Sequence, residues 1–198
     1  MTSGTYLVLT EDERHYLLTL ARRAIEAATS GRPLPQPDTL QISALLHEPG
    51  ACFVTLRKGG ALRGCTGVLV ARQPLAEEVL QTAAQTALHD PRFAPVTLAE
   101  SHQINIEVSV LTPPTRLQFQ TPDELLQRIR PRVDGVTLRR GPYRATFLPQ
   151  VWETIPDPSE FLSRLCEKMG LPPNSWLQPG MEVEIYQVQE FAEESLVD

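Results

Sequence analysis

The chain has 198 residues, of which 41% are hydrophobic and 21% are charged, and its formal net charge is −6. This length and composition suit one large globular domain or two tightly joined subdomains. The acidic balance disfavours indiscriminate binding to nucleic acid or anionic lipid, although it leaves room for a local basic site.

Targeting segments and disulfides are not expected. No run of about 18 apolar residues is present, so the sequence predicts no membrane-spanning helix. Residues 1–10 lack a basic start followed by an apolar stretch, which argues against a secretory signal. The three cysteines, Cys52, Cys65 and Cys166, are widely spaced and form no C-x-x-C pair. We therefore expect a cytoplasmic protein with reduced thiols, no structural zinc or other metal site, and no cofactor.

Local patterns predict the elements of the first half of the chain. Thr10-Glu11-Asp12-Glu13 is a capping box that opens a helix, and Asp90-Pro91 ends a later one. Lys58-Gly59-Gly60 is typical of a hairpin turn. In order, we expect a helix over 10–28, a loop over 30–38, a strand over 51–57, a returning strand over 61–70 and a helix over 75–89.

The second half alternates strands with short helices. Over residues 102–111, isoleucine and valine alternate with Asn105, Glu107 and Ser109, which is the pattern of a strand with one apolar face. Gly170 stands where a left-handed helix cap is expected. We expect a strand over 102–111, a short helix over 121–130, a hairpin of strands 136–140 and 143–148, a helix over 158–169 and a final strand over 181–191.

These elements favour the α+β class. Several strands follow one another as hairpins instead of alternating strictly with helices. We therefore expect a mainly antiparallel sheet with flanking helices.

The segment Arg63-Gly64-Cys65-Thr66-Gly67 is the first candidate site. Glycines within a strand mark a bulge, or the close approach of another backbone or a ligand. Two glycines around Cys65 would leave its sulfur accessible, and Arg63 would stabilise the thiolate, the reactive form of cysteine. The alternative is a bulged strand that carries a small buried thiol.

The segment Asp90-Pro91-Arg92-Phe93 has two interpretations. In the structural one, Asp90 accepts hydrogen bonds from backbone amides in the turn and Phe93 anchors the loop in the core. In the functional one, Arg92 is a planar fork for a carboxylate or phosphate.

Glu107 lies on the polar side of its strand, between Asn105 and Ser109. A solvated face explains this alternation. If the strand neighbours the Arg63–Gly67 segment, Glu107 becomes a general base or a partner for Arg63, and Ser109 a hydrogen-bond donor in the same row.

An arginine cluster follows later in the chain. Such a cluster can bind the phosphates of RNA or of a cofactor tail, and Arg139 and Arg140 are the candidate phosphate-binding residues. A solvated face, offset by acids such as Glu182 and Glu184, is the alternative. The cluster comprises Arg128, Arg130, Arg132, Arg139, Arg140 and Arg144.

Several motifs in order resemble those of the AMMECR-one family, also called AmmeMemoRadiSam system protein A, from about Gly50 to Phe191. Thr66 departs mildly from the family, which often has isoleucine there, and it would add a hydroxyl beside the cysteine. The matching segments are Leu62-Arg63-Gly64-Cys65-Thr66-Gly67, Asp90-Pro91-Arg92-Phe93 with Pro95, Glu107-Val108-Ser109-Val110-Leu111, Leu148-Pro149-Gln150-Val151, and Leu165-Cys166-Glu167-Lys168 with Gly170.

The resemblance carries expectations of its own. It implies a single domain made of a larger and a smaller subdomain, with the Cys65 motif lining a cleft between them, to which Gln150 would contribute. It also implies two partners, a radical S-adenosylmethionine enzyme and a Memo-type protein related to ring-opening dioxygenases, which would carry the metal centres. It supplies no settled reaction.

Three functions remain open. In the first, the protein is an enzyme or enzyme subunit: Cys65 is a nucleophile or covalent tether, Arg63 and Arg92 hold an anionic group, and Glu107 moves a proton. In the second, it is a non-catalytic binding module for RNA, a nucleotide or a small metabolite. In the third, it is a scaffold or adaptor for protein partners, and the glycine–cysteine motif serves only folding.

Overall fold

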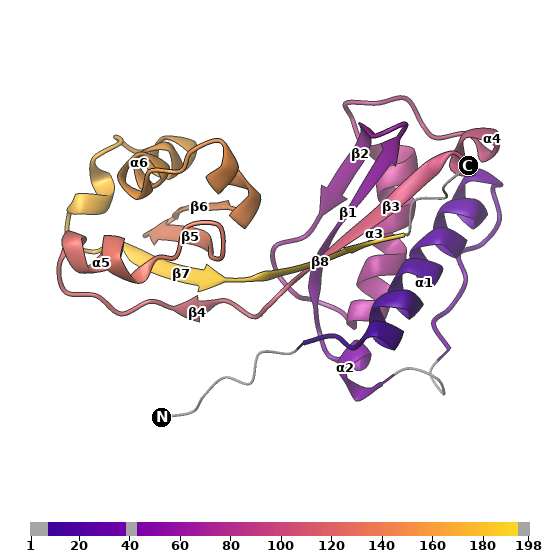
Figure 1. Cartoon of the computed structure of the whole chain (residues 1–198), viewed down its shortest axis with the longest axis horizontal. Helices are drawn as coiled ribbons and strands as arrows, with labels where there is room; N and C mark the ends of the chain where they lie inside the picture. Colours follow the sequence, from indigo (N-terminus) through magenta and orange to yellow (C-terminus); the bar gives the residue numbers. More distant parts are fainter. Residues whose placement is uncertain (1–7, 39–42, 194–198) are drawn as a thin grey trace. The chain divides into compact units, whose positions relative to one another are not determined.

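The computed structural model describes residues 8–38 and 43–193, and their contacts form two compact units (Figure 1). The first unit comprises the described residues up to Thr112 together with those from Gln189 on, and the second is Pro113–Val188. Each unit has its own hydrophobic core. In the described part of the chain, no helix is both long and apolar enough to cross a membrane. The cleft implied by the resemblance stays a prediction.

The first unit is a sheet in the order β2-β1-β3-β8, in which β1 is antiparallel to both β2 and β3. Helices α1 and α3 contact each other and the sheet, and alternate residues of β1 and β3, such as Val54 and Val108, are buried in the shared core. Its elements are α1 Glu11–Thr29, α2 Ala44–His47, β1 Ala51–Lys58, β2 Ala61–Gly67, α3 Leu75–His89, α4 Leu98–Ser101, β3 Ile104–Leu111 and β8 Val188–Ala192.

The other face of this sheet carries the residues that alternate with the buried ones. They are half-buried or, for Ser109, buried. We name this surface the Cys65 face; its members on β1, β2 and β3 are Phe53, Thr55, Arg57, Cys65, Asn105, Glu107 and Ser109.

The second unit is a sheet in the order β4-β7-β5-β6. Its core is centred on Trp152, which is fully buried and stacks on Phe161 with 3.6 Å between the ring centroids. Its elements are β4 Thr115–Arg116, α5 Pro122–Arg128, β5 Gly135–Arg140, β6 Tyr143–Phe147, η1 Pro149–Glu153, α6 Pro158–Lys168, η2 Ser175–Leu177 and β7 Glu182–Tyr186.

The α+β class with mainly antiparallel sheets is confirmed, as are the turn at Gly59-Gly60 and the left-handed cap at Gly170, all three glycines having positive φ. The single final strand over 181–191 was wrong. It consists of β7 and β8, which lie in different sheets with only Gln187 between them. The Gln187 amide donates to Asp134 Oδ1 at 2.9 Å, which fixes this junction to the second unit.

Candidate functional site

The two glycines of the Cys65 motif permit close packing of β2. A Cβ on Gly64 would lie 3.1 Å from Thr86 Cγ2 of α3, and a Cβ on Gly67 would lie 2.4 Å from the Cys52 carbonyl oxygen and 2.5 Å from the Phe53 ring. The predicted close approach is therefore confirmed, and the approaching groups belong to the protein. Arg63 is the extra residue at a register shift opposite Leu56 and Arg57, so the predicted bulge is also present.

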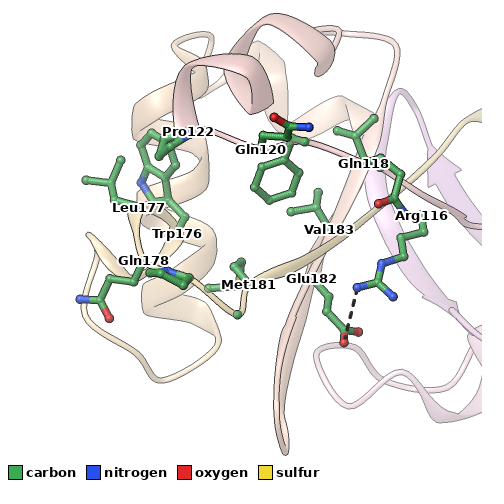
Figure 2. Close-up of a pocket in the computed structure, with 14 residues that line it drawn as sticks. Arg116, Gln118, Gln120, Pro122, Trp176, Leu177, Gln178, Met181, Glu182 and Val183 are labelled. Atoms are coloured by element: carbon green, nitrogen blue, oxygen red, sulfur yellow. Dashed lines mark ion pairs between the residues drawn. The ribbon is translucent and has the colours of Figure 1, made fainter.

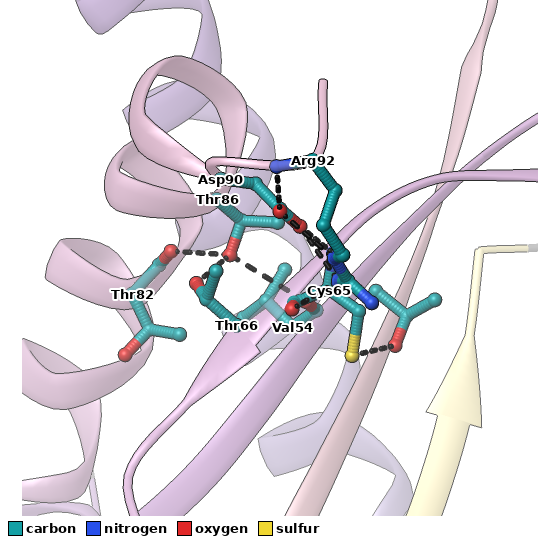
Figure 3. A network of polar contacts seen from close by, with 8 residues as sticks. Val54, Cys65, Thr66, Thr82, Thr86, Asp90 and Arg92 are labelled. Carbon is teal, nitrogen blue, oxygen red and sulfur yellow. Dashed lines mark hydrogen bonds and ion pairs between the residues drawn. The ribbon is translucent and has the colours of Figure 1, made fainter.

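The backbone of Cys65 is bound on the outer side of β2 by Asp90 and Arg92 (Figure 3). The Cys65 amide donates to Asp90 Oδ2 at 2.8 Å, and Arg92 Nη2 donates to the Cys65 carbonyl at 2.8 Å. Because β2 is an edge strand, these two side chains take the place of a missing neighbouring strand. The Asp90-Pro91-Arg92 turn thus serves to hold Cys65.

Asp90 and Arg92 are also bound to each other. Arg92 Nε and Nη2 donate to Asp90 Oδ1 and Oδ2 at 3.0 and 2.7 Å, and the Arg92 amide donates to Oδ1 at 3.1 Å. The hydrogen bonds from Arg92, followed by that from the Cys65 amide, hold the pKa of the Asp90 carboxyl well below its usual range, although burial acts in the opposite direction. The predicted bonding of Asp90 to backbone amides is confirmed.

The Cys65 side chain lies half-buried on the Cys65 face. Thr55 Oγ1, directly across on β1, donates to Cys65 Sγ at 3.3 Å. The thiol also interacts electrostatically with Arg57 and Arg92. The other two cysteines are free thiols buried in the two cores.

Glu107 pairs with Arg57 on the same face. Arg57 Nε lies 2.5 Å from Glu107 Oε1, and this hydrogen bond is the main reason that the pKa of Arg57 is raised. The conditional pairing of Glu107 with Arg63 required β3 to lie next to β2, and this condition is not met because β1 lies between them. Glu107 is on β3, two strands from Cys65, which corresponds to roughly 10 Å between their backbones. A direct proton transfer between the two side chains is therefore not supported.

Arg63 instead binds the segment that follows α3. Its Nε and Nη2 donate to the two oxygens of Glu100 at 2.8 and 3.0 Å, and Nη2 also donates to the Ala94 carbonyl at 2.8 Å. The Arg63 side chain is 16% exposed. Stabilisation of the Cys65 thiolate by Arg63 stays a prediction, and the commitment of the Arg63 side chain to Glu100 and Ala94 does not support it.

Replacing Glu100 by glutamine is expected to remove a pH-dependent part of the stability. Hydrogen bonds from Arg63 lower the pKa of Glu100 from 4.5 to about 2. A carboxyl with a depressed folded-state pKa stabilises the fold above pH 4.5, and this contribution is lost as the pH falls towards 2. We expect wild type to exceed Glu100→Gln by on the order of 2 kcal/mol at pH 7, and by about 1 kcal/mol at pH 3, where the Glu100 carboxyl is only partly protonated. Urea unfolding at both pH values measures it, and an equal difference at both would refute the assignment.

Thr66 faces α3 and not the cysteine side chain. Its Oγ1 lies 2.5 Å from Thr86 Oγ1, which itself donates to the Thr82 carbonyl at 2.7 Å (Figure 3). Because a hydroxyl has one hydrogen, Thr66 is then the donor to Thr86. The expectation that the Thr66 hydroxyl would lie beside the cysteine side chain was therefore wrong, since successive side chains of a strand point to opposite faces.

The expectation that Phe93 would anchor its loop in the core was wrong. It is half-buried, with the guanidinium carbons of Arg63 and Arg92 at 5.8 and 5.5 Å from its ring centroid. The nearby Val96 is buried in the core of the first unit, and its amide bonds the Ala87 carbonyl at 2.8 Å. Val96 therefore supplies the apolar anchor.

The remaining predicted residues fall in two places. Ser109 lies on the Cys65 face opposite Phe53, one row from Glu107, so these two residues share a face as predicted. Gln150 is exposed in η1 of the second unit. Among the described residues, no cluster of three or more His, Cys, Asp or Glu side chains is arranged to hold a metal ion.

The arginine cluster lies on the second unit and is largely matched by acids. Arg139 and Arg144 lie 4.0 and 3.8 Å from Glu182 and Glu184, as the solvated-face interpretation predicted. Arg140 donates to Gln178 at 3.1 Å. Arg128 and Arg130 pair with Glu124 and Asp134. Phosphate binding at Arg139 and Arg140 stays a prediction, and these ion pairs reduce the charge that would support it.

A pocket of about 350 Å³ lies within the second unit, where the segments leading from β4 to α5 and from η2 to β7 diverge (Figure 2). Apolar side chains form much of its wall, and Trp176 contributes its ring while its Nε1 donates to Ser163. The charged residues Arg116 and Glu182 lie 3.8 Å from each other. Its apolar lining residues include Phe119, Pro122, Trp176, Leu177, Met181 and Val183.

Thr55 and Arg57, the neighbours of Cys65 on β1, were not among the predicted site residues. Strand alternation contains the signal, because residues 53, 55 and 57 alternate with the apolar Cys52, Val54 and Leu56. The pocket was not predicted either, since the residues that line it come from two segments about 60 positions apart in the chain.

Fold and site together define a protein of two α+β units, with a half-buried cysteine clamped on the edge strand of the first. A family model described as AMMECR1 matches residues 18–191. The chain therefore belongs to the AMMECR1 family, as its motifs predicted.

Relatives extend over nearly the whole chain. A protein of Methanothermobacter thermautotrophicus is 40% identical over 191 residues, which cover 96% of this chain and 98% of that one. A protein of Methanopyrus kandleri is 39% identical over 195 residues, with 94% and 91% covered. The crystal structure of an uncharacterized protein from Pyrococcus horikoshii is similar, with a TM-score of 0.80 and 36% identity over 94% of each chain.

Proposed function

We propose that this protein is an enzyme subunit or accessory component whose reacting group is the Cys65 thiol, acting beside a radical S-adenosylmethionine enzyme and a Memo-type protein. The observation that carries the thiol assignment is the surroundings of the sulfur. Cys65 is a half-buried residue, and its Sγ accepts a hydrogen bond from Thr55 and interacts with Arg57 and Arg92. The partners rest on the family resemblance.

The other two cysteines are poorly suited to this role. Burial, with a smaller contribution from Glu78, raises the pKa of the Cys52 thiol to about 12. Burial also raises the pKa of Cys166. Since the thiolate is the nucleophilic form of cysteine, a raised pKa makes both thiols less suited to act as nucleophiles at neutral pH. Cys65 is left as the candidate nucleophile.

The charges around Cys65 favour an uncharged electrophile. Arg57 is paired with Glu107 and also interacts with Glu190, and Arg92 is paired with Asp90. These three carboxylates offset both guanidinium groups, so the site offers no surplus positive charge for an anion. We propose addition to a neutral carbonyl: one S–C bond forms, the thiol proton ends on the former carbonyl oxygen, and nothing is oxidised.

Replacement of Cys65 tests this function against a purely structural role. In cells that depend on this protein, Cys65→Ser and Cys65→Ala are expected to fail to complement while their melting temperatures stay close to that of wild type. Thr66→Val is the matched control, because it removes a hydroxyl from the opposite face of the same strand. Full complementation by Cys65→Ala would refute the proposal and favour the alternative in which the protein is a scaffold for its partners.

The pocket of the second unit supports a second candidate function, the binding of a small uncharged molecule. Its volume of about 350 Å³ lies in the range of ligand sites, and much of its lining is apolar. Its charged residues, Arg116 and Glu182, are paired with each other. Adenosine and indole are suitable probes for titration calorimetry.

The exposed rim residue Leu177 allows a specific test of this second candidate. Leu177→Ser is expected to weaken probe binding at least fivefold. The matched control, Leu98→Ser, alters a similarly exposed leucine of the first unit and should leave binding unchanged, the two exposures being 50% and 44%. If neither probe binds the wild-type protein, or if both variants bind alike, the pocket is not the ligand site.

A further inference from the structure

We infer that Thr55 is a positioning residue for the Cys65 thiol, with its hydroxyl holding and favouring the anionic sulfur. This inference rests on the proposed function of Cys65 and extends it to a residue that no motif identifies. Its basis is the hydrogen bond of 3.3 Å from Thr55 Oγ1 to Cys65 Sγ, between residues directly opposite on β1 and β2.

The hydrogen bonds of Cys65 to Asp90 and Arg92 show which kind of strand pair Cys65 and Thr55 form. In antiparallel strands, opposite residues either exchange both backbone hydrogen bonds or exchange none, and side chains of the second kind of pair lie closer together. The amide and the carbonyl of Cys65 are bound by Asp90 and Arg92 on the side away from β1. Cys65 and Thr55 therefore form the closer kind of pair, which brings hydroxyl and sulfur together.

The Thr55 hydroxyl has the Cys65 sulfur as its hydrogen-bond acceptor. Across the residues that the structure describes, it forms no hydrogen bond other than the one to Sγ. A β-branched side chain in a strand is also restricted in χ1, so the donor stays aimed at Cys65. The hydroxyls of Thr66 and Thr86, by contrast, bond each other on the α3 side of the sheet.

A hydrogen bond to sulfur acts differently on the two forms of the thiol. A donor stabilises an anionic acceptor more than a neutral one, so it favours the thiolate. Because an ordinary thiol is mostly protonated at pH 7 and mostly ionised at pH 10, a donor that favours the anion should benefit the reaction rate at pH 7 and have little effect at pH 10. A merely structural role for Thr55 would affect both conditions alike.

The test compares alkylation of Cys65 by iodoacetamide in three proteins, the wild type, Thr55→Val and Thr55→Ser, with peptide mapping by mass spectrometry. At pH 7 we expect Thr55→Val to react about tenfold more slowly, which corresponds to about 1.4 kcal/mol. At pH 10 the two rates should agree within about twofold. Thr55→Ser, which retains the hydroxyl, should react within about threefold of wild type at both pH values.

The possible outcomes separate the two proposals. A wild-type Cys65 that reacts no faster than Cys52 and Cys166 overturns the proposed function itself. A fast wild-type Cys65 with equal rates in Thr55→Val overturns only the role of Thr55. A loss of rate in Thr55→Val that is as large at pH 10 as at pH 7, or that serine does not restore, also overturns it. Melting curves of each variant identify any that fails to fold. If Thr55→Val fails, Thr55→Ala, which also lacks the hydroxyl, replaces it with the same expected rates.

Discussion

Replacing Asp90 by alanine is expected to destabilise the first unit by about 3 kcal/mol, because it leaves several groups without their acceptor. The Asp90 side chain is 2% exposed and accepts hydrogen bonds from the Cys65 amide and from three nitrogens of Arg92. Arg92 itself is 53% exposed, so water partly compensates its loss, and the unpaired Cys65 amide carries much of the cost.

The same carboxylate makes this loss depend on pH. Since the folded-state pKa of Asp90 lies below its ordinary value, its contribution is present above about pH 4 and is lost as the pH falls below that. The difference between wild type and Asp90→Ala should therefore shrink in acid. Trp152 and Trp176 both belong to the second unit, so tryptophan fluorescence would not report on the first unit. The measurement is therefore hydrogen exchange in peptides of β2 and α3. Glu77→Gln, which alters an exposed acid on α3, is the matched control. If Asp90→Ala lost as little stability as this control, the role of Asp90 in holding the backbone of Cys65 would be contradicted.

Replacing Gly67 by alanine is expected to destabilise the first unit by about 2–3 kcal/mol. The new Cβ would lie 2.4 Å from the Cys52 carbonyl oxygen and 2.5 Å from the Phe53 ring. The ring can move, but the carbonyl belongs to the backbone of β1 and accepts the Val68 amide at 2.9 Å. The end of β2 would have to separate from β1 to make room.

Gly64→Ala provides a graded comparison within the same motif. Its Cβ would lie 3.1 and 3.2 Å from Thr86 atoms, a contact that small shifts relieve, so we expect a loss of about 1 kcal/mol. Hydrogen exchange in β1 and β2 measures both variants. If the two variants lose equal stability, or if Gly64→Ala loses more, then Gly67 does not serve to permit the close packing of β2 on β1.

Local signals in the sequence predicted elements well but not their partners. The capping box at Thr10, the positive-φ turn at Gly59-Gly60 and the Asp90 stop each depend on residues a few positions apart, and each is present. The split of the final strand at Gln187 has no such signal. Its cause is the pairing of β7 with β5 and of β8 with β3, which are distant in sequence.

The candidate site shows the same division. Alternation along the strand correctly put Glu107 and Ser109 on one face, and the turn chemistry of Asp90 was predictable. The exchange of partners was not: Arg63 binds Glu100 and Glu107 binds Arg57, because a bulge in β2 alters where the Arg63 side chain points. A bulge position cannot be read from strand alternation, since the extra residue shifts the alternation itself.

Most residues of the two motifs have structural roles within the protein. Gly64 and Gly67 make room, Thr66 bonds Thr86, and Asp90 with Arg92 holds the backbone of Cys65. These contacts fix the strand, and of their members only Arg92 also interacts with the Cys65 sulfur. The sulfur instead accepts from Thr55 at 3.3 Å on the other face of the sheet. Because the surrounding motif residues have structural roles, we assign the function to the side chain of Cys65.

Competitive alkylation of the native protein tests that assignment most directly. At pH 7, with limiting iodoacetamide and isotope-coded labelling after unfolding, Cys65 should be modified at least tenfold faster than the two buried thiols, Cys52 and Cys166. If Cys65 reacts as slowly as they do, its sulfur is only another packed thiol and the proposed chemistry is wrong.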